Sequence, residues 1–221
     1  MAGKALYHHR TQGRDVEAVH IRGLVGGLEE LGYRVEIVGP PGVRADADAT
    51  DSPATGANRT LLGRIARSLP QPVFELAEIG YNLVALPRLV ARIRRDRPDF
   101  LYERYALYNA AGVLAGRLTG LPVILEVNDT VDMDRTRQGK SVRMRSLARW
   151  FERRIFAAAA GLTPVSGYLR DRLVEDGQAA DRIRVTPNAV DPGWFDPARF
   201  TGQRVREQYG LGAATVIGFA G

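Results

Sequence analysis

Charged and polar side chains stand at the ends of several apolar runs in this sequence. Glu103 and Arg104 close the run that starts at Phe100, and Asn128 follows the run Val123–Val127. A charged pair directly after an apolar strand costs desolvation free energy unless it meets a partner or a polar substrate. Glu103 and Arg104 therefore predict either a structural ion pair or a ligand contact.

Two further candidates lie at the beginning of the chain. Gly13 precedes a long helical pattern, and a glycine turn there lets backbone N–H groups approach an anion, although a lone glycine is also an ordinary turn. His20 lies on the first turns of the same helix. It can donate a hydrogen bond to a ligand oxygen, or it can be a helix-surface histidine.

None of the remaining polar residues considered is a candidate catalytic group. Asn128 can hydrogen-bond a polar ligand, but an amide exchanges no proton at neutral pH. Asp132 and Asp134 form an Asp-x-Asp pair before a basic helix, where charge complementarity at the helix N-terminus is a simpler account than a metal site. Ser166 is expected to cap the following helix rather than to act as a nucleophile.

These residues must be positioned by alternating strands and helices, a pattern typical of a parallel sheet covered by crossover helices. We expect an α/β fold with a doubly wound parallel sheet, whose strands have their carboxyl ends at one edge where ligands bind. The expected strands are Ala5–His9, Val35–Val38, Phe100–Glu103, Val123–Val127, Gly161–Val165 and Ile183–Val185. The expected helices are Val16–Leu31, Thr60–Arg97 with breaks near Pro70 and Pro72 and a bend at Pro87, Ala106–Leu118, Ser141–Ala160 and Gly167–Glu175.

Composition sets broad limits. The 221 residues suit one large domain or two small ones, and 45% apolar with 25% charged residues is ordinary globular composition. The chain has no cysteine, which excludes disulfides, zinc–thiolate sites and thiol nucleophiles. The first ten residues lack the apolar run of a signal peptide, and no 18-residue uncharged apolar run follows, so we expect a soluble, cytoplasmic chain.

The chain is basic, with a net charge of +6 and a pI near 10. Such a surface can bind nucleic acid, but no helix-turn-helix, zinc finger or aromatic RNA-binding pattern accompanies the charge, so we expect no nucleic-acid partner. Many arginines flank apolar residues, which fits a basic amphipathic helix on the inner face of an anionic membrane or, alternatively, a solvated helix face. They are Arg59, Arg64, Arg67, Arg88, Arg92, Arg94, Arg95 and Arg97.

Several motifs occur together in one order and cover essentially the whole chain. They are His20–Leu24, Leu31–Val38, Tyr102–Tyr105, Leu125–Asp129, Val165-Ser166 and Val185–Pro197. With these motifs the sequence resembles the amino-terminal domain of family 4 glycosyltransferases. Two positions depart from the family pattern: Gly13 stands where the family usually has a glycine pair, and Asn128 stands where it often has a histidine.

The resemblance implies the amino-terminal, Rossmann-like half of a GT-B enzyme that transfers a hexosyl-type sugar with retention of configuration. It implies a nucleotide-sugar co-substrate, a glycan or lipid-linked acceptor, and no metal or other cofactor. The substrate-binding residues expected from it and from their positions after the strands are Gly13, His20, Glu103, Arg104, Asn128 and Asn188. Asp191 also matches the motif beside Asn188.

The same resemblance divides the chain. Residues 1–200 are expected to form the acceptor-side domain, and residues 201–221 a linker and the first strand, Ala214–Phe219, of a missing donor-binding domain. The donor would bind through that missing domain, so the chain alone is expected to be inactive. Residues 43–58 read as a long exposed loop. The alternative function is a basic anion- or nucleic-acid-binding module without catalysis.

Overall fold

The computed structural model of the chain describes residues 3–10, 15–40, 70–133, 142–188, 196, 198 and 201–217, apart from the side chains of residues 15–18. The chain divides into two compact units, Met1–Asn188 and Ala189–Gly221. The first unit holds the sheet and all but one of the described helices. The described part of the second contains the short helix α8, Gln203–Gln208.

The first unit is built on one parallel sheet. Its strands are β1 (Gly3–His8), β2 (Tyr33–Val38), β3 (Phe100–Arg104), β4 (Val123–Val127) and β5 (Gly161–Pro164), in the order β2-β1-β3-β4-β5. Every pairing is parallel. This confirms the predicted doubly wound sheet, and it places the reversal of strand order between β1 and β3.

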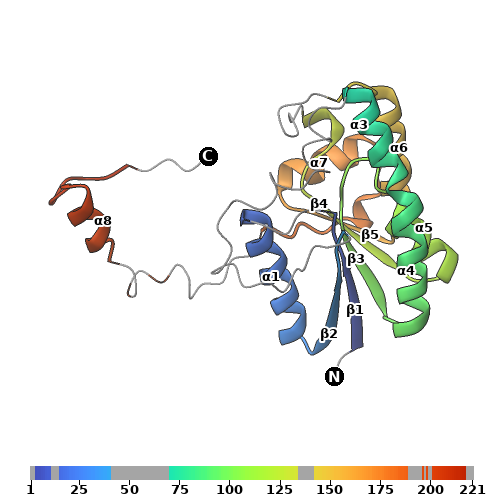
Figure 1. Cartoon of the computed structure of the whole chain (residues 1–221), viewed down its shortest axis with the longest axis horizontal. Coiled ribbons are helices and arrows are strands. Elements are labelled where there is room, and N and C mark those ends of the chain that lie inside the picture. Colours follow the sequence, from blue (N-terminus) through green and yellow to red (C-terminus); the bar gives the residue numbers. More distant parts are fainter. Residues whose placement is uncertain are drawn as a thin grey trace. The chain divides into compact units, whose positions relative to one another are not determined.

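Helices cover both faces of this sheet (Figure 1). The helices are α1 (Asp15–Glu30), α3 (Gln71–Gly80), α4 (Asn82–Asp96), α5 (Ala111–Thr119), α6 (Arg145–Ala158) and α7 (Gly167–Glu175), with two 3₁₀ turns at Val131–Met133 and Ala180–Arg182. Ser166 caps α7 as predicted, since its Oγ accepts a hydrogen bond from Leu169 N at 3.3 Å.

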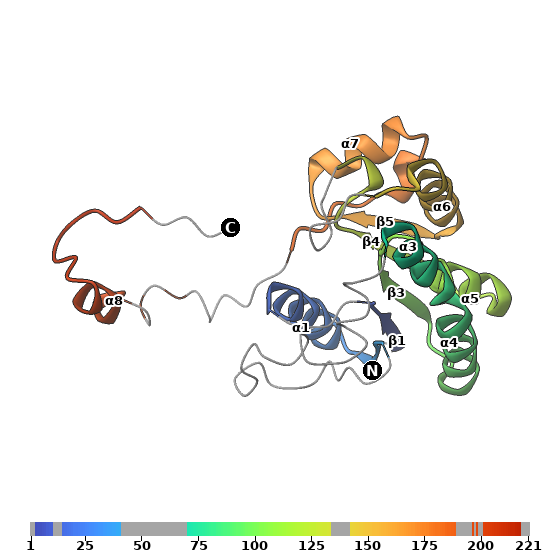
Figure 2. The same ribbon diagram turned by 45° about the horizontal axis from the view of Figure 1, so that its top comes forward.

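The two faces carry different cores because side chains alternate along each strand. Leu6, Leu101 and Leu125 point to the face covered by α4, α5 and α6, where most of the buried apolar residues lie. Tyr7 and Tyr102 point to the opposite face and pack with residues of α1. Figure 2 shows α1 on its own side of the strands, away from α4 and α5.

Two sequence expectations fail in detail, and a third lies partly outside the described residues. Residues 183–185 form no sixth strand, because Ile183 makes only a single bridge to Leu162 beside β5. The helix expected from Ala106 begins at Ala111. Residues 214–217 form no strand, and the side chain of Ile217 is 94% exposed, while residues 218 and 219 lie outside the described residues.

The late start of α5 has a physical cause. Tyr108 adopts a left-handed backbone conformation, with φ at 61°, that a helix does not accept. Asn82 then holds the loop, because its Nδ2 donates to Tyr108 O at 2.8 Å and its Oδ1 accepts from Ala110 N at 2.7 Å. The loop after β3 is thereby fixed to the junction of α3 and α4.

A buried glutamate of α3 caps the N-terminus of α6. The carboxylate of Glu75 accepts from Arg143 N at 2.7 Å, Met144 N at 3.0 Å and Tyr108 Oη at 2.6 Å. Burial alone would raise the pKa of Glu75, but these hydrogen bonds outweigh it and the pKa is lowered. A carboxylate at this position also complements the positive end of the helix dipole.

A second buried glutamate, Glu152 of α6, holds the loops after β3 and β4. Its Oε2 accepts from Tyr105 Oη at 2.9 Å and from Val131 N at 2.8 Å. Burial raises the pKa of Glu152 from 4.5 to about 7, against these two hydrogen bonds and with a smaller contribution from the negative charges of Asp132 and Asp176.

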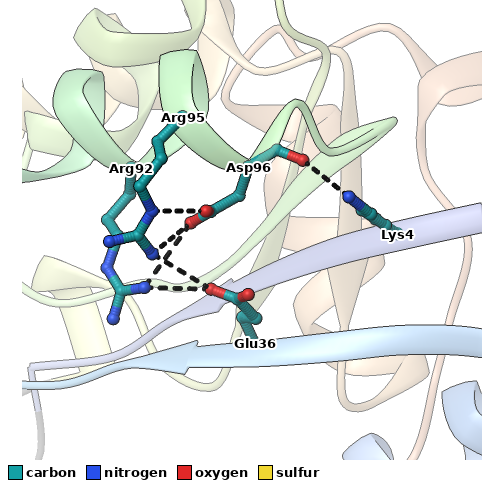
Figure 3. Close-up of polar contacts among 5 residues, drawn as sticks. All are labelled: Lys4, Glu36, Arg92, Arg95 and Asp96. Carbon is teal, nitrogen blue, oxygen red and sulfur yellow. Dashed lines mark hydrogen bonds and ion pairs between the residues drawn. The ribbon is translucent and has the colours of Figure 1, made fainter.

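The end of α4 is joined to the edge of the sheet by a network of charges (Figure 3). Arg92 Nη1 lies 3.0 Å from Glu36 Oε2 of the edge strand β2, and Arg95 Nη2 lies 2.8 Å from Asp96 Oδ2. Lys4 Nζ of β1 donates to Asp96 O at 3.2 Å. Charged groups on an edge strand also discourage pairing with a further strand.

We predict that Gly116→Ala destabilises the fold. A Cβ on Gly116 would meet Val123 Cγ2 and would lie 2.7 Å from Leu121 O, so α5 would have to move away from β4. Overpacking of this kind costs roughly 1–3 kcal/mol of unfolding free energy. Gly27→Ala in α1 is the control: nothing lies within 4 Å, and the better helix propensity should add roughly 0.5–1 kcal/mol. Urea denaturation measures both, and equal stability of the two variants would contradict the close packing of α5.

We also predict that Glu152 makes stability depend on pH. Between pH 4.5 and about 7 the unfolded chain has lost this proton while the folded chain keeps it, so the free energy of unfolding falls as pH rises through this window. The contribution is at most about 3 kcal/mol. Glu152→Gln should remove it and be more stable than the wild type at pH 8, yet similar at pH 4. The measurement is urea denaturation of both proteins between pH 4 and 8. If the free energies of unfolding of the two proteins changed with pH in parallel, this assignment would be contradicted.

Candidate functional site

Polar residues gather at the carboxyl edge of β1, β3 and β4 in two separate clusters. The Glu126 cluster, made of His20, Arg104, Glu126 and Asn128, lies on the face of the sheet covered by α1. The Glu103 cluster, made of His8, Glu103 and Asn109, lies on the opposite face beneath α5. The alternation of side chains along β3 separates them, because the neighbours Glu103 and Arg104 point to opposite faces.

The Glu126 cluster is centred on one carboxylate oxygen. Glu126 Oε1 lies 2.7 Å from Arg104 Nη1, 2.5 Å from Asn128 Nδ2 and 3.1 Å from His20 Nε2. Its Oε2 is buried and accepts no hydrogen bond within the described part of the chain. Arg104 and Asn128 are only partly buried, so they are the members of the cluster nearest to solvent.

The electrostatics of this cluster keep Glu126 ionised. Burial alone would raise the pKa of Glu126, but the close approach of His20 Nε2, the charge of Arg104 and the hydrogen bond from Asn128 outweigh it, so the pKa is lowered. Burial and the charge of Glu126 raise the pKa of Tyr7 and of Tyr102, which stay neutral phenols. Glu126 therefore contributes a fixed negative charge that orients Arg104 and Asn128.

The Glu103 cluster is more deeply buried. Glu103 Oε1 lies 2.6 Å from His8 Nδ1 and accepts from Asn109 Nδ2 at 3.1 Å, and the side chains of Glu103 and His8 are 0% and 1% exposed. Gly112 at the start of α5 leaves the room for this carboxylate, since a Cβ there would lie 2.5 Å from Glu103 Oε1. The cluster joins β1, β3 and the loop before α5.

The structure brings three of the six predicted site residues together. His20, Arg104 and Asn128 meet at Glu126, and His20 is buried, so the alternative of a helix-surface histidine is wrong. Arg104 forms a structural ion pair, one of the two alternatives for the charged pair. Glu103 lies on the other face.

Of the other two predicted residues, the structure describes Asn188 alone. Asn188 has an exposed side chain, two residues after Thr186, whose N donates to Pro164 O at 2.9 Å at the end of β5. Gly13 lies outside the described residues, as do Asp134 and Asp191.

Sequence reasoning missed the residue at the centre of the cluster. Glu126 stands inside the apolar run Val123–Val127, where burying a carboxylate costs free energy unless it has partners. A glutamate in such a run was the sequence feature that could have indicated a buried polar cluster. It also missed His8, which ends β1, and Arg10, whose Nη1 donates to Leu107 O at 3.1 Å and whose guanidinium pairs with Glu78.

Asp132 lies among arginines. It pairs with Arg149 and lies 3.8 Å from Arg145 Nη2 and 3.7 Å from Arg172 Nη2. Arg145 and Arg149 belong to the first turns of α6, as charge complementarity near that helix requires. No group of three or more histidine, aspartate or glutamate side chains that could hold a metal ion occurs among the residues with described positions.

Solved structures with a similar fold include a glycosyltransferase, a UDP-GlcNAc 2-epimerase and the protein MnaA. A glycosyltransferase from Rickettsia africae has 15% identity over 96% of this chain and 50% of its own, with a TM-score of 0.56. The S. aureus protein MnaA, solved with UDP, has 16% identity over 84% of this chain and 44% of its own, with a TM-score of 0.54. The UDP-GlcNAc 2-epimerase of Neisseria meningitidis, solved with UDP-GlcNAc, has 15% identity over 93% of this chain and 52% of its own, with a TM-score of 0.51.

These likenesses concern the fold. The chain spans about half the length of each of these proteins, and its five-stranded parallel sheet matches one half of the GT-B fold, as the motifs predicted. No curated protein matches the sequence. A profile of the family described as Glycosyltransferase Family 4 matches residues 18–194. Since this match covers most of the sequence and contains every member of the Glu126 cluster, the chain belongs to glycosyltransferase family 4, a family of retaining enzymes.

Proposed function

We propose that the Glu126 cluster binds the acceptor in a retaining transfer of a hexosyl-type sugar from a nucleotide-sugar to a glycan or a lipid-linked glycan. The observation that carries this proposal is the position of the cluster. Arg104 ends β3 and His20 lies on the helix after β1, so the cluster borders the point where strand order reverses. Open α/β sheets bind ligands in the crevice at this point.

The chemistry of the cluster suits a sugar. Asn128 donates through Nδ2 to Glu126, which leaves its Oδ1 to accept from a sugar hydroxyl. Arg104 donates one N–H of its guanidinium to Glu126 and is partly exposed, which leaves further N–H donors for a sugar oxygen. Glu126 itself is 1% exposed, so it acts as a positioning residue that holds Arg104 and Asn128 rather than as a direct contact.

The donor is proposed by analogy. MnaA and the N. meningitidis epimerase were solved with UDP and UDP-GlcNAc, and this chain matches about half of each. In a two-domain GT-B enzyme the second half would hold the nucleotide-sugar, and this chain would supply the acceptor wall of the cleft. Asn188 after β5 is proposed to border that wall. Glu103, on the opposite face of the sheet, is proposed to stabilise the fold by holding His8 rather than to contact the acceptor.

We expect simple glycosides to bind weakly at the Glu126 cluster. Methyl glucoside, methyl mannoside and methyl N-acetylglucosaminide, titrated into the ¹⁵N-labelled chain, should shift the NMR signals of the Asn128 side-chain amide and of Arg104 Nε–H. Asn128→Ala should weaken binding by roughly 3- to 10-fold, the loss of one neutral hydrogen bond. Glu126→Gln should weaken it by roughly 10- to 100-fold, because a charge-assisted hydrogen bond that orients Arg104 is lost.

Glu29→Gln and Arg34→Gln are matched controls, since both residues are exposed and outside the cluster. They should bind as the wild type does. Shifts confined to residues outside the cluster, or equal affinity of all four variants, would contradict the acceptor site. Binding of inorganic phosphate but of no glycoside would instead support an anion-binding module.

The two clusters should respond differently to mutation. Glu103→Gln removes the buried charge that faces His8, and we expect it to lower the free energy of unfolding by about 1–3 kcal/mol. Because the Glu103 cluster lies on the opposite face of the sheet, the variant should still shift the Asn128 amide signal with the same glycosides. Loss of that shift in a folded Glu103→Gln variant would show that the clusters act as one site.

A further inference from the structure

The outward face of α3 and α4 is apolar where a helix normally meets water. Tyr81 between the two helices keeps right-handed helical dihedrals, with φ at −56° and ψ at −31°, so one outward face runs along both helices (Figure 1). The exposed positions of that face over residues 72–87 carry no charge and no hydrogen-bonding side chain. We call this set the α3–α4 stripe: Pro72, Val73, Leu76, Ala77, Leu83, Val84 and Pro87.

The stripe is not part of the core. Leu83 is 82% exposed, Leu76 57%, Val84 49% and Val73 45%. The opposite face of α4 already fills the core through Ala85, Leu89 and Ile93. Single exposed apolar residues are common, but a contiguous set in helical register is typical of a surface that meets an apolar partner.

Arginines continue the same face toward the end of α4. Arg88 and Arg94 are exposed, and neither forms an ion pair with an acidic side chain among the described residues. Arg92 and Arg95 differ, because they pair with Glu36 and Asp96. Of the eight arginines named in the sequence, Arg92 and Arg95 are thus structural, and Arg88 and Arg94 extend the stripe. Arg97 is the left-handed C-cap of α4, and Arg59, Arg64 and Arg67 lie outside the described residues.

An apolar stripe followed by unpaired arginines matches an anionic bilayer surface. Leucine, valine and proline side chains can enter the boundary between headgroups and acyl chains, and guanidinium groups bind lipid phosphates. A second copy of the chain would have to place acidic groups opposite Arg88 and Arg94, and the stripe contains none. A nucleic acid would use the arginines but would leave the apolar half uncovered.

We propose that the α3–α4 stripe, together with Arg88 and Arg94, is a peripheral membrane-binding surface that rests on anionic lipid. No helix in the described ranges is long and apolar enough to cross a bilayer. In the proposed contact, α3 and α4 lie on the surface of the bilayer. The proposal is independent of acceptor binding, since the Glu126 cluster lies on the other face of the sheet.

Co-sedimentation of the full chain with large unilamellar vesicles tests the proposal. We expect binding to phosphatidylcholine vesicles that contain 30% phosphatidylglycerol and much weaker binding to phosphatidylcholine alone. Binding should fall at high salt, because added ions screen the arginines. Arg88→Gln and Arg94→Gln should each lower the partition coefficient about fivefold, the equivalent of about 1 kcal/mol for each basic residue.

The apolar half is tested by Leu76→Asp with Leu83→Asp, which should lower the partition coefficient at least about tenfold. Both leucines are exposed, so circular dichroism should show an unchanged fold. Leu31→Asp and Arg34→Gln are the matched controls, since Leu31 is 70% exposed outside the stripe and Arg34 is exposed on the edge strand. Both controls should bind as the wild type does.

Four results would overturn the proposal. They are absence of binding to the anionic vesicles at low salt, equal losses in the control variants, binding that depends on the arginines but not on the leucines, and self-association that Leu83→Asp abolishes without any vesicle binding. The third would assign the arginines to a polyanion such as nucleic acid, and the fourth would assign the stripe to a second copy. None of these results would change what is expected for glycoside binding in the NMR titration, so the two proposals can fail separately.

Discussion

Burying a carboxylate costs several kcal/mol unless hydrogen bonds and opposite charges replace the lost water. Among the residues that the structure describes, four glutamates are buried near one edge of the sheet. Each one is compensated by groups from other elements. Glu75 accepts hydrogen bonds from the backbone just before α6, and Glu103 contacts His8 of β1. Glu126 contacts Arg104 of β3 and His20 of α1. Glu152 accepts hydrogen bonds from the loops after β3 and β4. The loops at the carboxyl edge are therefore held by tertiary hydrogen bonds as well as by apolar packing.

The four carboxylates are not electrostatically alike. Donors surround Glu75 and Glu126 closely enough to lower the pKa of each despite burial, whereas Glu152 has two donors and two nearby acids, and its pKa rises to about 7. Glu126 thus stays ionised and holds Arg104 and Asn128 in fixed positions at neutral pH. The pKa of Glu152 lies near neutral pH, and its carboxylate contacts the loop residues Tyr105 and Val131 rather than the Glu126 cluster.

Helices α3 and α4 carry different chemistry on their two faces. On the inner face, Glu75 accepts hydrogen bonds at the start of α6, and Asn82 accepts a hydrogen bond from the loop after β3. Leu89 and Ile93 of the same face pack into the core. The outer face is apolar over residues 72–87 and then basic. The inner face accounts for how the carboxyl edge is held, and the outer face is left as a surface for a partner with an apolar and anionic character.

The sequence alone determined the parallel sheet, its first five strands and the family, because these follow from apolar periodicity, glycine and proline positions and local motifs. It also placed His20, Arg104 and Asn128 at the correct edge, since each stands at or after the end of a strand or on the helix that follows one. Only the tertiary structure decided which side chains meet: alternation along β3 sends Glu103 beneath α5 and Arg104 toward Glu126, and the depth of His20 depends on how α1 packs. The start of α5 was also decided there, because the bonds from Asn82 and the left-handed Tyr108 come from contacts distant in sequence, which local propensity does not encode.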